Sequence, residues 1–303
     1  MEFSKLLRRK TAWATAIFLQ DVLTIPPIGE PAHLLSSKKL FRAPTSPHTR
    51  ADPFLFNQNG RLFLFYETQA GDDYGRIEAA EVTHNELKPI GTVLAESFHV
   101  SYPAVFEMDG EVYMLPESQG AGEMRLYRFT RFPDRIEFVR TLMPGQFADP
   151  SPLVIDETLY IFATNDFGLQ LYVLEDIIAG SPVLHPASPI TNERDLRRCG
   201  GAPFQLKGQL VRPAQAFRRR YGDDLSLLAI EHLSPTQYSE RPFRMNICDR
   251  RHGWDAQGGH HVSTAKFGER WAVAVDGQAY DYYIHKIISR AALWLARLKT
   301  PRI

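Results

Sequence analysis

Two aspartates of the sequence, Asp52 and Asp149, stand in the same Ala-Asp-Pro setting. Each is followed by an apolar run, a polar turn and an aromatic-rich run, and the segment around Tyr102 repeats this order with Ser-Tyr-Pro at its start. Carboxyl groups that meet in one cleft can have their pKa values pushed apart, and acid/base chemistry on a sugar requires this separation. The two aspartates are therefore the first candidate catalytic residues.

The segments that carry these residues recur about every 50 residues, and a period of that length indicates a repeat architecture. In the first three copies a proline precedes an apolar run, a turn and a second apolar run, which is the pattern of a β-hairpin. A further strand pair fits between successive hairpins, as at residues 75–82. The hairpins are expected to begin near Asp52, Tyr102, Asp149, Gly201 and His260.

Four strands in each of five repeats predict an all-β fold, a five-bladed β-propeller, as one domain over residues 1–282. A ring of blades leaves no long exposed sheet edge, which a solenoid would have to cap. The apolar run at residues 12–19 lies outside the repeats. We expect it to form a strand that closes the ring in the last blade.

In a propeller blade the innermost strand starts at one pole and the second strand returns to it, so residues at these two positions should meet in one pocket. We expect Asp52, Asp149 and Glu117 to be catalytic there. Glu117 is included because Pro116 and Tyr113 could desolvate it and raise its pKa. The expected substrate-binding residues are Glu67, Tyr102, Asn165, Arg212, Gln215, His260, His261 and Asp276. The alternative for any one of these positions is a polar residue that caps its own turn.

Charge and cysteine content exclude several classes of protein. Lys plus Arg and Asp plus Glu are 35 each, so the net charge is zero and no global field attracts nucleic acid. Cys199 and Cys248 cannot form a disulfide framework, which favours a reducing, cytoplasmic location. No run approaches the roughly 18 apolar residues of a spanning helix, and the N-terminal apolar patch lacks the small-residue cleavage site of a signal peptide.

Local motifs for common cofactors are absent from the sequence. No GxGxxG, GxSxG or P-loop pattern occurs, so we expect no nucleotide cofactor and no serine nucleophile elbow. His252, His260 and His261 match no zinc spacing, so we expect no metal ligands among them, although a single metal or water on the propeller axis stays open. The three arginines at residues 218–220 are interpreted as a solvated loop, with a phosphate clamp as the alternative.

Three blocks of the sequence carry a family resemblance: ADPFLF at residue 51, SYPAVFE at residue 101 and RPAQ at residue 212. They resemble the propeller domain at the N-terminus of plant glucosamine inositolphosphorylceramide transferases and of bacterial proteins associated with surface polysaccharides. The similarity covers residues 12–280. More remotely, the chain is similar to the five-bladed arabinanase and β-xylosidase clan of glycoside hydrolases.

In that clan an aspartate opening the first blade is the general base, an aspartate opening the third tunes pKa values, and a glutamate opening the fourth is the general acid. The resemblance implies the first role for Asp52 and the second for Asp149. Gly201 stands where the acid would be, so the resemblance supplies no general acid here. A histidine of the last blade faces the axis in the clan, and His260 or His261 fits that place.

The missing acid decides between two kinds of reaction. A glycosidic oxygen leaves badly unless it is protonated, whereas a phosphate leaving group needs positive charge, which Arg212 could supply. We therefore expect a carbohydrate-active enzyme that carries out glycosyl transfer at a glycosidic or sugar-phosphate bond, in surface glycan or glycolipid metabolism. One alternative is a glycoside hydrolase with Glu117 as a displaced acid. The other is a propeller that only binds a sugar, glycan or sugar-phosphate while a partner enzyme does the chemistry.

The segment at residues 283–303 leaves the repeat pattern and predicts a basic amphipathic helix. Ile287, Ala291, Trp294 and Leu298 fall on one face, and Lys286, Arg290 and Arg297 gather on a neighbouring one. Such a helix can lie on an anionic membrane. The alternative is that its apolar face packs against the propeller or against a second copy of the chain.

Overall fold

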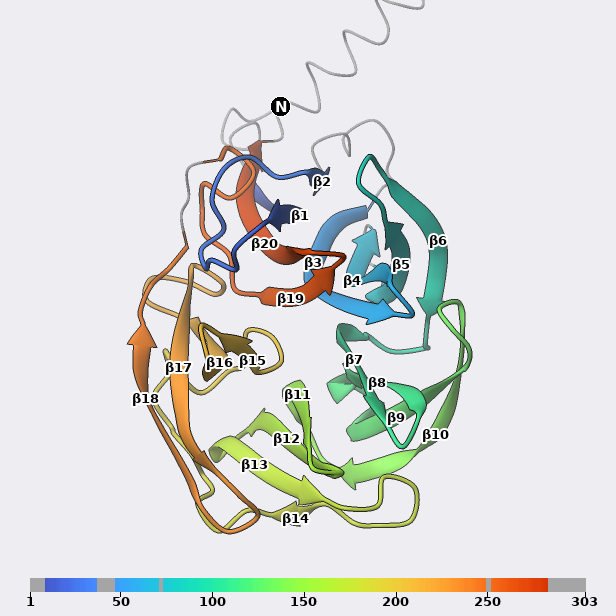
Figure 1. Cartoon of the computed structure of the whole chain (residues 1–303), viewed down its shortest axis with the longest axis vertical. Helices are drawn as coiled ribbons and strands as arrows, with labels where there is room; N and C mark the ends of the chain where they lie inside the picture. Colours follow the sequence, from blue (N-terminus) through green and yellow to red (C-terminus); the bar gives the residue numbers. More distant parts are fainter. Residues whose placement is uncertain (1–8, 37–46, 71–72, 249–251, 283–303) are drawn as a thin grey trace, which may run out of the picture.

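Five four-stranded antiparallel sheets surround a common axis in the computed structural model, which describes residues 9–36, 47–70, 73–248 and 252–282 (Figure 1). This arrangement confirms the predicted five-bladed propeller. The first three blades consist of β3 (Pro47–Gln58), β4 (Arg61–Ala70), β5 (Arg76–Val82) and β6 (Leu87–Leu94); β7 (Ser101–Met108), β8 (Glu111–Glu117), β9 (Glu123–Arg131) and β10 (Arg135–Pro144); and β11 (Ala148–Ile155), β12 (Thr158–Asn165), β13 (Gly168–Leu174) and β14 (Val183–Leu184). A short 3-10 helix, η2 (Gln119–Ala121), joins β8 to β9.

The last two blades complete the ring with a strand from each end of the described chain. They consist of β15 (Phe204–Leu206), β16 (Gln209–Ala216), β17 (Asp224–Leu233) and β18 (Tyr238–Arg244); and β19 (Val262–Phe267), β20 (Arg270–Tyr282), β1 (Arg9–Gln20) and β2 (His33–Leu35). The N-terminal strand β1 pairs with β20 from Arg9↔Tyr282 to Gln20↔Trp271. The predicted ring-closing strand is confirmed, and it lies inside the blade because β2 pairs on its outer side.

Two-residue turns join the innermost strand of a blade to the next one. Asn59 and Gly60 have φ of 53° and 80°, and Asp109 and Gly110 have 54° and 76°. Two successive positive φ angles are the signature of a type I′ turn, whose twist matches that of the flanking strands. The sequence meets this requirement with asparagine or aspartate followed by glycine, the residues that adopt this backbone most easily.

A bulge interrupts the innermost strand in the first three blades. The residue before the proline, Asp52, Tyr102 or Asp149, has φ of 51°, 50° and 51° respectively, and the pairing register shifts there in each blade. A bulge of this kind redirects a side chain out of the ordinary alternation of a strand. Positive φ in a residue other than glycine is strained, and such strain persists where the surroundings enforce it.

The apolar core is divided among the interfaces between neighbouring blades. Phe65 of β4 and Tyr127 of β9 belong to one buried cluster, and Ile17 of β1 and Leu64 of β4 belong to another. Comparable clusters fill the remaining interfaces. Packing each blade on both neighbours fixes the angular position of every innermost strand, which in turn positions the polar residues at its start.

The predicted C-terminal helix lies outside the described residues. Within the described ranges, no helix has the length and apolar character needed to cross a lipid bilayer.

Candidate functional site

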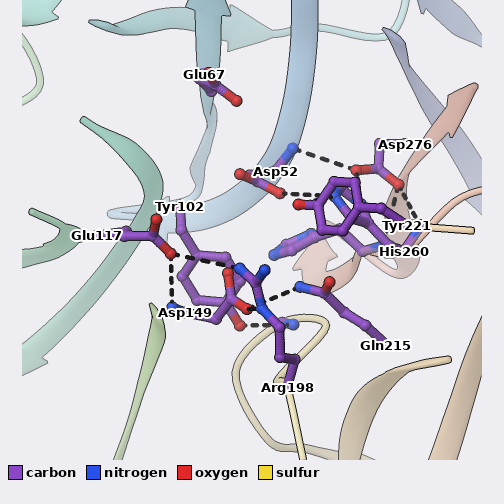
Figure 2. Close-up of polar contacts among 12 residues, drawn as sticks. Asp52, Glu67, Tyr102, Glu117, Asp149, Arg198, Gln215, Tyr221, His260 and Asp276 are labelled. Carbon is purple, nitrogen blue, oxygen red and sulfur yellow. Dashed lines mark hydrogen bonds and ion pairs between the residues drawn. The ribbon is translucent and has the colours of Figure 1, made fainter. Parts of the chain in front are cut away.

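The bulged residues and their neighbours converge at the end of the ring where the innermost strands begin (Figure 2). Asp52 of blade 1 lies beside two residues of blade 5: its carboxylate is 3.8 Å from His260 Nε2, and its backbone N–H points at Asp276 Oδ2 at 3.5 Å. Asp276 Oδ2 is 2.5 Å from His260 Nδ1. Asp276 Oδ1 accepts the backbone N–H groups of His260 and His261. Asp276 thus orients the His260 ring, which faces Asp52.

A second group forms around Asp149 of blade 3. Arg198 donates from Nε to Asp149 Oδ2 at 2.5 Å, and its Nη2 lies 3.6 Å from Glu117 Oε2. Glu117 also accepts the backbone N–H of Asp149 at 2.9 Å. Gln215 Nε2 donates to Asp149 Oδ2 at 3.0 Å and to the carbonyl of Cys199 at 2.8 Å. Asp149, Glu117 and Gln215 are thereby brought together as expected, around an arginine that we did not predict.

We call the cluster of polar residues around Asp52, Glu117 and Asp149 the pocket, and aromatic side chains lie on its side nearest blade 5. Trp13 of β1 stacks on the ring of His260, with centroids 4.3 Å apart and an interplanar angle of 22°. Tyr221, in the loop between β16 and β17, places its hydroxyl 3.0 Å from His260 Nε2. The Arg198 guanidinium lies 5.5 Å from the Tyr221 ring centroid. Tyr221 therefore bridges the two polar groups, and neither it nor Trp13 was predicted from the sequence.

Glu67 lies apart from these two groups in Figure 2, and its carboxylate contacts His99 instead. Its Oε1 is 3.4 Å from His99 Nε2, and His99 Nδ1 accepts the backbone N–H of Gly75 at 3.0 Å. Because Nδ1 accepts, the ring proton of neutral His99 is on Nε2, facing Glu67. Burial raises the pKa of Glu67 well above its ordinary value, and the charges of Asp52 and Glu117 add to this effect.

Burial controls the protonation of the pocket. It raises the pKa of Asp52 to about 7, against the opposing charge of His260. Burial and the charge of Asp149 raise the pKa of Glu117 to about 8. Burial alone would lower the pKa of His260, but the negative charge of Asp276 outweighs this effect and the pKa of His260 is raised. Burial alone would raise the pKa of Asp276, but the positive charge of His260 outweighs it and the pKa of Asp276 is lowered. The carboxyl groups therefore differ in protonation near neutral pH.

Tyr102 and His261 form the packed floor beneath the pocket. The Tyr102 hydroxyl accepts the backbone N–H of Gly201 at 2.7 Å and lies 2.6 Å from Ser151 Oγ. The His261 ring contacts the rings of Tyr102 and Phe54 edge-on, and neither ring nitrogen has a hydrogen-bond partner. Burial lowers the pKa of His261 to about 3, so the ring is neutral. Both side chains are therefore buried and held by packing contacts, and their predicted role in substrate binding stays a prediction.

Gly201 cannot be replaced by an acidic residue without a change of backbone. Its φ is 129°, and a Cβ atom there would lie 2.1 Å from the carbonyl oxygen of Val262. This position therefore has no room for the general acid that the resemblance to the hydrolase clan would place there.

Two further residues predicted from the sequence lie outside the pocket. Arg212 is fully buried and donates through Nε and Nη2 to the carboxylate of Glu240, at 2.8 and 2.6 Å. Residues three apart on a strand point to opposite faces, so Arg212 and Gln215 of β16 cannot both face the pocket. Asn165 caps a turn, because its Oδ1 accepts the backbone N–H of Phe167 at 2.9 Å. Both corrections follow from local geometry that the repeat pattern does not specify.

One group of possible metal ligands occurs among the described residues. Asp52, His260 and Asp276 offer atoms that all lie within 4.8 Å of one another. His260 Nδ1 lies at ion-pair distance from Asp276, and His260 Nε2 forms a hydrogen bond with the Tyr221 hydroxyl. The geometry therefore fits a chain of ion pairs and hydrogen bonds, which needs no metal to satisfy its charges.

The fold and the pocket define a class of protein: a five-bladed propeller whose innermost strands bring buried carboxylates to one end of the ring. A family model described as "Glucosamine inositolphosphorylceramide transferase 1, N-terminal" matches residues 21–278. The chain belongs to this family. Glucosamine inositolphosphorylceramide transferase 1 of Oryza sativa subsp. japonica is 33% identical over 244 residues, and that of Arabidopsis thaliana is 33% identical over 263 residues.

The matches to these relatives cover 75% and 80% of this chain but only 33% and 34% of the relatives. The chain thus spans about a third of the length of the curated relatives that it matches. Solved structures show the same fold at low identity. An α-L-arabinofuranosidase from Clostridium thermocellum has a TM-score of 0.51 at 13% identity, covering 78% of this chain and 85% of its own. A β-1,2-mannobiose phosphorylase from Listeria innocua has a TM-score of 0.57 at 10% identity, covering 91% and 99%.

Proposed function

We propose that this propeller is a carbohydrate-active enzyme domain that transfers a glycosyl group at a glycosidic or sugar-phosphate bond. The observation that carries the proposal is the convergence of Asp52, Glu117 and Asp149 around Arg198, with burial separating the protonation of the carboxyl groups. The names of the curated relatives, which are glucosamine inositolphosphorylceramide transferases, support a sugar-directed activity.

The chemistry assigns a separate task to each side of the pocket. Asp52, when ionised, accepts the proton of an acceptor hydroxyl as the hydroxyl oxygen attacks the anomeric carbon. The bond between that carbon and the leaving oxygen breaks in the same step. Glu117, whose pKa of about 8 keeps it protonated at neutral pH, donates its proton to an alcohol leaving group. A phosphate leaving group departs as an anion instead, and Arg198 stabilises its charge.

Asp149 and Asp276 position the side chains that take part in the reaction. Asp149 fixes Arg198 and Gln215 through its Oδ2 atom. Asp276 fixes His260, whose positive charge favours the ionised form of Asp52. Tyr221 provides an exposed aromatic ring beside His260, on which the apolar face of a sugar ring can pack.

The test is Asp52→Asn, compared with Asp156→Asn in the β11–β12 turn. A panel of monosaccharides and sugar nucleotides is first screened for binding by nuclear magnetic resonance, and turnover of the ligands that bind is then measured. We expect Asp52→Asn to lower turnover about 100-fold or more while binding is retained, because a carboxamide cannot act as a base. Asp156→Asn should leave both unchanged. Full turnover in Asp52→Asn would disprove the proposed role of Asp52.

A second candidate function is a glycan-binding module without catalysis. It is favoured by the limited coverage of the relatives, since two thirds of each lies outside the match and could hold the catalytic centre. In that case the wild-type protein binds a sugar of the panel without turning it over. Asp52→Asn then changes only the affinity, by the loss of one ligand contact.

A further inference from the structure

An arginine-rich rim lies beside the carboxylate pocket. We define the arginine rim as Arg194 and Arg198, which precede blade 4, together with Arg218 and Arg219 of the β16–β17 loop. Phe217 joins the two segments: its backbone N–H donates to Asp195 Oδ1 at 3.1 Å, and the guanidinium groups of Arg194 and Arg198 lie 5.9 and 6.0 Å from its ring centroid. Two like charges are thus gathered at one aromatic ring.

Of the rim arginines, Arg198 is paired with Asp149 and Glu117, and two further acidic residues, Asp195 and Asp223, hold the backbone of the rim. Asp195 accepts from Phe217, as described. Asp223, which is fully buried, accepts the backbone N–H groups of Arg218 and Arg219 at 3.1 and 3.2 Å and the Nε–H of Arg219 at 3.2 Å. Such contacts fix the loop but leave other guanidinium groups uncompensated.

Arg194 and Arg218 are exposed, and neither forms an ion pair with any residue in the described part of the chain. The whole chain has a net charge of zero, so the positive charge of the rim is a local feature. Guanidinium groups gathered in this way match the geometry of a phosphate, which accepts paired hydrogen bonds from them.

The rim is continuous with the pocket through Arg198 and Tyr221. Arg198 contacts Asp149 and Glu117 on its pocket side and the rings of Phe217 and Tyr221 on its rim side. Tyr221 in turn reaches His260. A sugar in the pocket and a phosphate joined to it therefore fit two adjoining parts of one surface.

We propose that the arginine rim binds the phosphate group of a phosphorylated sugar, whose sugar ring occupies the carboxylate pocket. The placement of the sugar rests on the proposed function, but the binding of phosphate does not. The phosphate belongs either to a soluble sugar phosphate or to a lipid-linked sugar phosphate, because both present the same anion to the arginines.

The variant that tests the rim is Arg194→Ala/Arg218→Ala. Its matched control is Arg135→Ala/Arg241→Ala, which removes two exposed arginines from the first position of β10 and from the outer strand β18. Thermal unfolding checks that both variants are folded. Inorganic phosphate is titrated by calorimetry into each full-length protein at low and high salt, since exposed ion pairs weaken as salt screens them.

We expect phosphate to bind the wild-type protein and the control alike, and the rim variant to bind about tenfold more weakly. The affinity should fall at high salt. Equal phosphate affinity in the rim variant and the control, or no binding to the wild-type protein at millimolar phosphate, overturns the proposal.

A vesicle experiment distinguishes the two sources of the phosphate. Phosphatidylcholine vesicles with and without phosphatidylinositol are sedimented with the wild-type protein and the rim variant. Binding that requires both phosphatidylinositol and the rim identifies a lipid-borne phosphate, whereas phosphate binding in solution without such sedimentation identifies a soluble one. Asp52→Asn should bind phosphate normally, so a failure of the proposed catalysis leaves this result standing and the two ideas are separable.

Discussion

Burial sets the protonation state of Glu117 and therefore links the pocket to the stability of the protein. Its pKa is about 8 in the folded protein, compared with about 4.3 for an exposed glutamate. The folded protein thus holds a proton that the unfolded chain releases. The free energy of unfolding consequently falls as the pH rises between these two values.

Glu117→Gln removes this dependence, because a carboxamide does not titrate. We expect the free energy of unfolding of the variant, relative to the wild-type protein, to increase from pH 5 to about pH 8 and to level off above that pH. Denaturant unfolding at pH 5, 7 and 9 provides the measurement. A difference between the two proteins that stays constant over this range contradicts the raised pKa.

The sequence identified part of the pocket and missed another part for definable reasons. Asp52 and Asp149 could be predicted because their position in the repeat determines where each blade places them. Arg198 lies just before the fourth repeat begins, where no repeat position specifies its direction, although the Arg-Arg-Cys-Gly-Gly run was visible in the sequence. Arg212 was assigned to the pocket from its place in the repeat, but strand alternation directs it to Glu240.

At the scale of the elements, the bulge in the innermost strand of the first three blades has a strained backbone, and it redirects the side chain of the residue before the proline. Asp52 has φ of 51°, a conformation that costs a residue with a Cβ atom about 1 kcal/mol or more and costs glycine little. The hairpin period and the turn residues could be predicted from the sequence. The bulge could not, because proline restricts the preceding residue to extended backbone in most contexts.

Replacing Asp52 by alanine and by glycine isolates this strain, since both variants lose the carboxylate. We expect Asp52→Gly to be about 1 kcal/mol more stable than Asp52→Ala, measured by equilibrium denaturation. The same pair of substitutions at Thr92, an exposed position on the outer strand β6 without a positive φ, should show the opposite order. If alanine were the more stable residue at both positions, the backbone of Asp52 would not be strained.

At the scale of the whole molecule, the ring depends on β1 being held between β20 and β2. Ala16 is fully buried and is paired on both sides, with Val275 and Leu34. Ala16→Pro removes a backbone donor from an interior strand. We expect it to lower the free energy of unfolding by more than about 2 kcal/mol.

The control is Lys88→Pro on the outer strand β6, which pairs only with β5. Its loss of stability should be clearly smaller, because proline is tolerated on edge strands. Denaturation midpoints give the comparison. Equal losses at the two positions would argue against a special role of β1 in closing the ring.

The basic amphipathic helix predicted at residues 283–303 remains a prediction at this scale. We expect its apolar face to pack against the propeller or against a second copy of the chain, and contact with an anionic membrane is the alternative. If the membrane role holds, deletion of residues 284–303 should abolish sedimentation with anionic liposomes at low salt, and high salt should weaken sedimentation of the intact protein. Equal sedimentation of the two forms contradicts the membrane role, and an insoluble truncated protein favours a packing role for the helix.

The stacking of Trp13 on His260 also sets an order of events during synthesis of the protein. Trp13 lies on β1 and His260 lies just before β19, so one side of the pocket joins segments made near the start and near the end of the described chain. The first four blades can assemble while the ribosome is still working, as domains generally fold during synthesis. The histidine side of the pocket forms only after blade 5 has emerged and β1 has docked on it. A partly made chain therefore has no complete pocket, and the closing of the ring and the completion of the site are one event.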